Sequence, residues 1–230
     1  MAVNIYSDIM SSPCRAIINL CRVAGIEHNV VVTDIMKGDH KKPEYLAINP
    51  RGLIPAIKDG DFCLGESAAI LRYLCDAKKA PENFLPREDR KKRAIIESLM
   101  DYTCTTVRTN VENTFLAETF YAPFFMGKPA ATEERVKEIY ETKLHPVFKV
   151  LEEMLEKTPF LVGEEVSVAD LYISEEFREA IVLKQMEFGP FEKVAQWYER
   201  VSKIPGVEQT ATEMTTTFDA IMKATSEKKE

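Results

Sequence analysis

A hairpin that contains proline and runs straight into a helix is the feature that most constrains the fold of this chain. Pro55 lacks a backbone donor and biases the residue before it toward extended geometry, so the segment around it cannot be helical. Apolar runs at residues 54–58 and 62–64 flank the pair Asp59-Gly60. Asp-Gly between apolar runs is a strong signal for a tight turn, so the sequence predicts a β-hairpin here.

The start of a helix follows this hairpin at Glu66 and Ser67. The residues after it form one apolar face with helical spacing, which consists of Ile70, Leu71, Tyr73 and Leu74. At the start of a helix the first backbone N–H groups have no partner and the helix dipole is positive. We therefore expect this helix end to bind a carboxylate.

The first residues of the chain predict a strand, a loop and a helix, all of which precede the hairpin. Residues 4–6 suit a short strand, and Ser11 and Ser12 stand where the N-cap of the helix is expected. Pro13 suits a first helical position because its missing N–H would have no helical partner there. Apolar residues inside this helix follow, namely Ile17, Ile18, Leu20 and Cys21.

Three segments jointly resemble the thioredoxin-like domain of cytosolic glutathione S-transferases: the run Ser-Ser-Pro-Cys-Arg-Ala at residues 11–16, the segment 49–57, and the helix start at residues 66–67. The serine at position 11 is similar to that of the theta and delta classes, in which a serine faces the sulfur of glutathione. The resemblance covers nearly the whole chain. It implies an α/β N-terminal thioredoxin-like domain with a mixed four-stranded sheet, followed by an all-α C-terminal domain.

The chain divides at a polar segment, residues 78–87, that carries two prolines. We predict a thioredoxin-like domain at 1–78, a linker at 79–88 and a helical domain at 89–230. Within the helical domain, Ser167 three residues before Asp170 predicts a capping box at the start of a core helix. The charged tail at residues 227–230 is expected to be frayed.

Charge and cysteine usage exclude several classes of function. The net charge of -7 disfavours nucleic acid as a partner, because phosphate binding needs clustered basic residues. No apolar run is long enough to span a bilayer, and the start lacks a secretory pattern, so we expect a cytoplasmic protein that does not enter membranes. The five cysteines are scattered without a C-x-x-C pair, which indicates neither disulfides nor a metal site.

The chemistry that a glutathione site must perform gives Ser11 a role. A thiol attacks electrophiles well only as the thiolate, and near its usual pKa of about 8.5 it is mostly protonated at neutral pH. The Ser11 hydroxyl can donate a charge-assisted hydrogen bond to the sulfur anion. Serine as the nucleophile would need a base and an orienting acid, and the histidines of this chain fall in no serine-hydrolase signature.

The resemblance also implies the groups that hold glutathione as co-substrate. Ser67 and the helix N–H groups would hold the γ-glutamyl carboxylate, and Glu66 the amino group. The main chain of Ile54, before a cis Pro55, would pair with the cysteinyl part as an added strand.

His40 and Lys41 would meet the glycine carboxylate, although a histidine in an exposed loop is an alternative reading of His40. The chain departs from the family at Leu53, where some theta-class proteins have lysine, and at Gly52, where delta-class proteins have histidine. Arg51 is a candidate replacement for the missing contact.

In the helical domain, Arg108 resembles an arginine of theta-class proteins that reaches the active site, and an exposed helix arginine is the alternative. Met10, Phe115 and Phe120 are candidates for the electrophile pocket within a group rich in aromatic residues and methionine. The same aromatic residues equally suit a helix end packed into the core.

The resemblance implies a homodimeric glutathione transferase of detoxification and glutathione metabolism. Its electrophiles would be small and hydrophobic, such as alkyl halides and epoxides, with organic hydroperoxides as a further class. Two alternatives remain open at this point. One is a glutathione-dependent thiol reductase that uses Cys14, whose pKa could be lowered near a helix N-terminus. The other is a binding module without activity, like the transferase-like domain of elongation factor 1 gamma.

Overall fold

In the computed structural model of the protein, residues 2–226 are described, and the tail 227–230 for which fraying is expected lies outside this range. The residues divide into two compact units. The first unit comprises the chain up to Arg87 together with the segment from Ser202 onward, and the second comprises Glu88–Val201. The break between Arg87 and Glu88 falls inside the predicted linker 79–88, and the last helix is grouped with the first unit.

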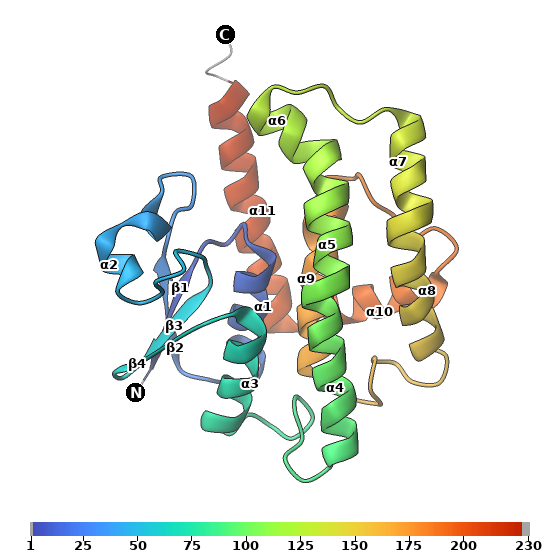
Figure 1. The fold of residues 1–230 in the computed structure, drawn as a ribbon. Coiled ribbons are helices and arrows are strands. Elements are labelled where there is room, and N and C mark those ends of the chain that lie inside the picture. The colour runs from blue at the N-terminus through green and yellow to red at the C-terminus, as the bar shows by residue number, and fades with distance from the viewer. Residues whose placement is uncertain (1, 227–230) are drawn as a thin grey trace. The chain divides into compact units, whose positions relative to one another are not determined.

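The first unit is built on a mixed sheet of four strands in the order β2-β1-β3-β4. β1 pairs in parallel with β2 and antiparallel with β3, and β3 pairs antiparallel with β4. Figure 1 shows α1 and α3 on one side of the sheet and α2 on the other. The elements are β1 (Val3–Ser7), α1 (Ser12–Val23), β2 (His28–Val32), η1 (Asp39–Lys41), α2 (Pro43–Leu46), β3 (Ala56–Asp59), β4 (Phe62–Gly65), α3 (Ser67–Ala77) and α11 (Pro205–Ser226).

The predicted hairpin is present, and its turn lies one residue later than predicted. β3 ends at Asp59, and Gly60-Asp61 forms the two-residue connection to β4. Asp59 stays in the strand because its carboxylate accepts hydrogen bonds from Tyr73 Oη (2.8 Å) and Lys78 Nζ (2.8 Å) of the α3 region. Gly60 supplies the left-handed backbone, with φ of 60°, that a tight hairpin requires.

α11 packs against α1 through a glycine and an ion pair. A Cβ atom on Gly206 would lie 2.8 Å from Cβ of Arg22, so only glycine permits this approach. The Arg22 guanidinium donates to both carboxylate oxygens of Glu213 (2.9 Å each) and to Thr210 Oγ1 (2.8 Å). These contacts are the physical reason why the end of the chain is grouped with the thioredoxin-like part.

The second unit is helical, and Figure 1 shows the run from α4 to α6 beside the run from α7 to α8. Three π-helical segments interrupt these runs within residues 2–226, and α9 packs against the first two of them. The elements are α4 (Arg90–Tyr102), η2 (Thr103–Val107), α5 (Arg108–Asn110), η3 (Val111–Tyr121), α6 (Ala122–Met126), α7 (Glu133–Ile139), η4 (Tyr140–Leu144), α8 (His145–Met154), α9 (Val168–Val182) and α10 (Glu192–Ser202).

The capping box predicted at the start of α9 is confirmed. Asp170 has no exposed surface, and its carboxylate accepts hydrogen bonds from the main chain of Leu161 (2.9 Å) and Ser167 (2.8 Å), from Ser167 Oγ (2.6 Å) and from Trp197 Nε1 (2.8 Å). A buried carboxylate needs this degree of hydrogen bonding. Asp170 therefore joins α9, α10 and the loop before α9.

No helix within residues 2–226 is long and apolar enough to cross a bilayer.

Candidate active site

Four predicted binding segments leave the sheet at the same end. Ser7, the last residue of β1, lies beside Val32 at the end of the parallel strand β2. Ala56, the first residue of β3, lies beside Tyr6 of β1 and Gly65 at the end of β4. Segments that follow β1, β2 and β4 or precede β3 must therefore emerge together. These are the segments of Ser11, of His40 and Lys41, of Ile54 and Pro55, and of Glu66 and Ser67.

The loop that carries Ser11 is fixed from both sides. The Asp8 carboxylate accepts hydrogen bonds from the N–H of Met10 (3.0 Å) and the N–H of Ile35 (3.2 Å). Arg15, which has no exposed surface, donates to the carbonyls of Ile9 (3.1 Å) and Met10 (2.8 Å). The sequence analysis gave Arg15 no role, and the available signal was a charged residue within the apolar face of α1. Its buried guanidinium holds the backbone just before Ser11.

Ser11 is the N-cap residue of α1, with extended backbone, yet its side chain makes no capping hydrogen bond. The reason lies in the next residues. Pro13 has no N–H to cap, and the N–H groups of Cys14 (3.1 Å) and Arg15 (3.0 Å) already donate to the Ser11 carbonyl. The Ser11 hydroxyl is half-buried and is not needed to hold the helix start.

Cys14 does not have the properties of a nucleophile. Its side chain has no exposed surface, and burial raises the pKa of its thiol by more than hydrogen bonding from the Ser11 hydroxyl lowers it. The idea that the helix N-terminus would lower this pKa is wrong, because removal from water outweighs the helix end. Since a thiol is a weak hydrogen-bond acceptor, the Ser11 hydroxyl loses little by turning to a better one.

The segment before β3 is held by its carbonyl at Leu53. Tyr45 Oη (2.6 Å) and Asn49 Nδ2 (2.7 Å) both donate to this oxygen. The Ile54–Pro55 peptide is cis, as the sequence analysis predicted. Ile54 is half-buried, and within residues 2–226 neither its main-chain N–H nor its carbonyl forms a hydrogen bond. The backbone at Ile54 thus offers one donor and one acceptor to a ligand.

η1 contacts the segment before β3 at Gly52. Lys41 Nζ donates to the carbonyl of Gly52 (2.7 Å). Gly52 has φ of 59°, and a Cβ atom there would lie 3.1 Å from Lys41 Nζ and 3.2 Å from the carbonyl oxygen of His40. This close approach explains why glycine, and not the histidine of delta-class proteins, suits position 52.

His40 is half-buried, and its Nδ1 atom is buried with no hydrogen-bond partner among residues 2–226. A ligand arriving from solvent would therefore contact the ring through Nε2.

Glu66 is the N-cap residue of α3 and has the strained backbone of a non-glycine residue at φ of 69°. Strain of this kind costs roughly 1 to 3 kcal/mol and is concentrated at functional sites. The Glu66 carboxylate is exposed and lies 3.7 Å from Arg51 Nε. The first helical hydrogen bond runs from the Ile70 N–H to the Glu66 carbonyl (2.9 Å), so the N–H groups of the first turn, beginning with that of Ser67, have no helical acceptor.

Arg108 is not an exposed helix arginine. Its guanidinium donates to both carboxylate oxygens of the fully buried Glu176 (2.6 and 3.2 Å) and to Tyr172 Oη (3.0 Å). Burial would lower the pKa of Arg108, but the charge of Glu176 outweighs it and the pKa is raised. The donors of Arg108 are therefore directed at α9.

The three electrophile-pocket candidates fall in different surroundings. Met10 lies in the first unit, where its carbonyl is bound by Arg15. Phe115 and Phe120 are both buried side chains of η3 in the second unit. Phe120 stacks on Phe124 with ring centroids 5.1 Å apart, whereas Phe115 contributes to the wall of a cavity. Core packing thus describes Phe120, and a pocket shared by all three residues stays a prediction.

Two family models match the chain. The model of the glutathione S-transferase N-terminal domain matches residues 10–77, and the model of the glutathione S-transferase C-terminal domain matches residues 116–209. The first of these ranges contains every residue predicted to bind glutathione.

Curated relatives and solved structures are similar over most of their lengths. Glutathione S-transferase theta-3 of Mus musculus is 32% identical over 87% of this chain and 82% of that relative. Glutathione S-transferase theta-1 of Homo sapiens is 30% identical over 90% of this chain and 85% of that relative. A human theta-class glutathione transferase, solved in complex with the glutathione conjugate of 1-menaphthyl sulfate, has a TM-score of 0.84 at 28% identity and covers 100% of this chain and 92% of its own.

Proposed function

The chain belongs to the glutathione S-transferase family, and we propose that Ser11 stabilises the glutathione thiolate for attack on small hydrophobic electrophiles. The family supplies the coarse function, which is that of a glutathione S-transferase enzyme with theta-class relatives. The observation that carries the finer proposal is the side chain of Ser11. It sits at an N-cap, makes no capping bond, and emerges from the sheet end that also carries Ile54 and Glu66.

The energies required are within reach of this group. Lowering the thiol pKa by about two units takes roughly 2.7 kcal/mol. A hydrogen bond from the Ser11 hydroxyl to the sulfur anion contributes about 1.5 to 3 kcal/mol. The positive end of α1, which begins at Ser12, adds about 0.3 to 1 kcal/mol. One hydroxyl and one helix end therefore suffice, without a metal ion or a general base.

The proposed binding mode uses main-chain groups at Ile54 and at the start of α3. The cysteinyl part of glutathione pairs with the N–H and carbonyl of Ile54 as an added strand, which is supported by the absence of other partners for these groups within residues 2–226. The γ-glutamyl carboxylate accepts from the first turn of α3 at Ser67, and the amino group pairs with Glu66. His40 and Lys41 attract the glycine carboxylate.

Arg51 is proposed to orient Glu66, because the two side chains already lie within ion-pair distance. This differs from the sequence-based idea that Arg51 replaces a contact to the glycyl end. Arg108 is proposed to support the second unit through Glu176, since its guanidinium is bidentate there.

We propose the electrophile classes on the theta-class resemblance alone. Alkyl halides, epoxides and organic hydroperoxides are the classes to screen, with Met10 as the candidate pocket residue next to Ser11. A homodimer and a cytoplasmic location are also predictions. A thiol reductase that uses Cys14 is disfavoured by the complete burial of that thiol.

The test is the pKa of the glutathione thiol bound to the purified protein, measured by thiolate absorbance against pH. We expect a pKa well below the free value in the wild type, and a rise by about one to two units in Ser11→Ala. An unchanged pKa in Ser11→Ala would mean that another group stabilises the anion. No bound thiolate in the wild type would instead favour a binding module.

A further inference from the structure

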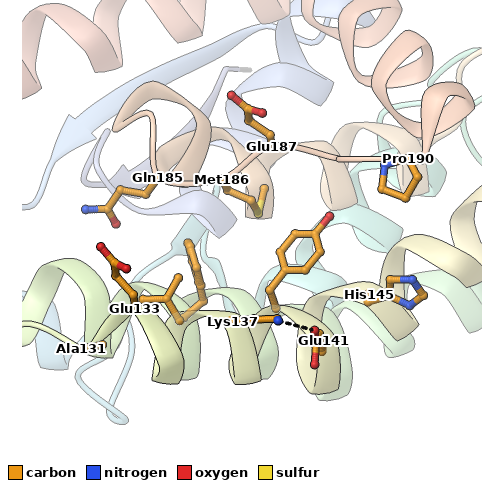
Figure 2. A pocket seen from close by; sticks show the side chains of 12 residues that line it. Ala131, Glu133, Lys137, Glu141, His145, Gln185, Met186, Glu187 and Pro190 are labelled. Carbon is orange, nitrogen blue, oxygen red and sulfur yellow. Dashed lines mark ion pairs between the residues drawn. The ribbon is translucent and has the colours of Figure 1, made fainter.

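The second unit contains a cavity of about 710 Å³ to which no role has been given so far. Its walls come from η3, from α7 with η4, and from the loop between α9 and α10 (Figure 2). The volume lies within the range of about 300 to 1,000 Å³ that small-molecule sites occupy. Among the predicted site residues only Phe115 contributes to it, and none of the predicted glutathione ligands does.

The floor of this cavity is apolar. Phe115 and Met186 are almost completely buried and form it together with the half-buried Val136. Methionine and aromatic side chains make an apolar surface that adapts to flat or irregular ligands. The floor therefore suits the hydrocarbon body of a small molecule.

The rim of the cavity is acidic. Glu133, Glu141 and Glu187 line it together with one lysine, Lys137. Lys137 Nζ lies 3.9 Å from Glu141 Oε1, and this ion pair is drawn in Figure 2. Glu133 and Glu187 are exposed and form no ion pair with any residue in 2–226. Two carboxylates at the mouth of an apolar cavity are thus left without a cation.

The negative charge of Glu187 affects Tyr140 in the cavity wall. Burial raises the pKa of Tyr140 at the cavity wall, and the negative charge of Glu187 raises it further. A Cβ atom on Gly189 would lie 2.6 Å from Tyr140 Oη, so glycine at this position leaves room for the phenol. The charge of Glu187 therefore acts on Tyr140, and a carboxylate and an aromatic ring both attract a positive charge.

We propose that this cavity is a second binding site, for a small organic amine with an apolar body. The body rests on the floor of Phe115, Val136 and Met186, and the ammonium pairs with Glu133 and Glu187. Glutathione and its conjugates are anions, which the two carboxylates repel. The site is therefore distinct in ligand class from the glutathione site, and it does not depend on the role proposed for Ser11.

The experiment uses two fluorescent probes with the same apolar body and opposite charges. Dansylcadaverine carries an ammonium tail, and a dansyl alkylcarboxylate of the same chain length carries a carboxylate. Binding of each to the full-length protein is titrated by dansyl fluorescence at low ionic strength. Two exposed ion pairs predict that the wild type binds dansylcadaverine about tenfold more tightly than the carboxylate probe.

The variants separate charge from shape. The double variant Glu133→Gln/Glu187→Gln should abolish the preference for the cation, while the control Glu164→Gln/Glu165→Gln, at exposed positions outside the cavity, should keep it. Val136→Trp should weaken both probes about tenfold by filling the cavity. Both Gln variants are exposed and isosteric, so they test the proposal even if Val136→Trp fails to fold.

Equal affinity of the wild type for the two probes would overturn the proposal. So would a preference that survives in the Glu133→Gln/Glu187→Gln variant, or displacement of dansylcadaverine by saturating glutathione. Failure of these tests leaves the thiolate experiment on Ser11 untouched, since that experiment measures a different ligand.

Discussion

Two helices of this protein begin with a serine at the N-cap, one in each unit, and the two serines do opposite things. Ser167 accepts from the N–H of Asp170 and takes part in a complete capping box at α9. Ser11 stands at the same position of α1 and makes no side-chain capping bond. Because a serine caps a helix only where N–H groups still need a partner, the residues that follow decide its role.

The residues that follow Ser167 differ from those that follow Ser11 in how many N–H groups they offer. After Ser167 come Val168 and Ala169, which keep their N–H groups. Two residues after Ser11, Pro13 occupies the second helical position and has no N–H. The N–H of Cys14 donates to the carbonyl of Ser11. The first arrangement uses the serine side chain to cap the helix, and the second leaves the serine side chain without a capping bond, as the proposed role of Ser11 requires. The two sites should therefore respond oppositely to mutation.

The largest effect of a mutation is expected at the capping box of α9. Asp170→Ala leaves several buried donors unsatisfied, including Trp197 Nε1, and each costs roughly 1 to 3 kcal/mol. We expect the free energy of unfolding to fall by about 3 kcal/mol or more, measured by urea denaturation followed through the fluorescence of Trp197, the single tryptophan of the chain. A loss below about 1 kcal/mol would mean that the cap contributes no more than an exposed one.

Ser11→Ala should give the complementary result. Without the hydrogen bond to the thiolate, kcat/KM for conjugation should fall about ten- to a hundredfold. The free energy of unfolding should stay within about 0.5 kcal/mol of the wild type, because Ser11 makes no capping bond. The matched control is Ser167→Ala, which should lose about 1 kcal/mol of stability and retain kcat/KM. If both alanine variants lose stability alike, the contrast between the caps fails.

Substitutions of Glu66 test whether the backbone at the start of α3 is strained. Glu66→Ala and Glu66→Gly both remove the carboxylate, so both should raise the KM for glutathione by a similar factor. Only alanine keeps the cost of φ at 69°, so the glycine variant should be the more stable of the two by about 1 kcal/mol. Thermal denaturation of the two variants side by side measures this, and equal stability would show that the backbone is not strained.

The smallest effect on activity is expected at Cys14. Burial raises the pKa of Cys14, and it raises the pKa of Cys21 to about 12, so both thiols stay protonated at pH 8. In the folded protein, alkylation by iodoacetamide should modify the partly exposed Cys63 and Cys104 and spare the three buried thiols, which are Cys14, Cys21 and Cys75, until denaturant is added. Cys14→Ala should keep kcat/KM within about twofold. Rapid labelling of Cys14 at pH 8 would revive the reductase alternative.

Local patterns predicted much of the first unit. The strand before Ser11, the helix after it and the helix start at Ser67 all depend on residues a few positions apart, whereas the cis Ile54–Pro55 peptide was expected from the family resemblance. Such signals act through backbone donors and turn geometry, which the sequence states directly. The hairpin turn was misplaced by one residue because the Asp59 carboxylate is held by Tyr73 and Lys78, and no local rule contains those contacts.

The sequence by itself determined the capping box of Ser167 and Asp170 and the loss of one N–H at Pro13, since both depend on residues within four positions of each other. Only the structure decided that the Ser11 side chain makes no capping bond, what holds its loop in place and which charged groups are already bound. Arg15 reaches back to the loop before Ser11, and Arg108 is bound by Glu176, 68 positions away. Hydrogen bonds of this kind form only after packing removes both partners from water, so their energies depend on distances that spacing along the chain does not contain.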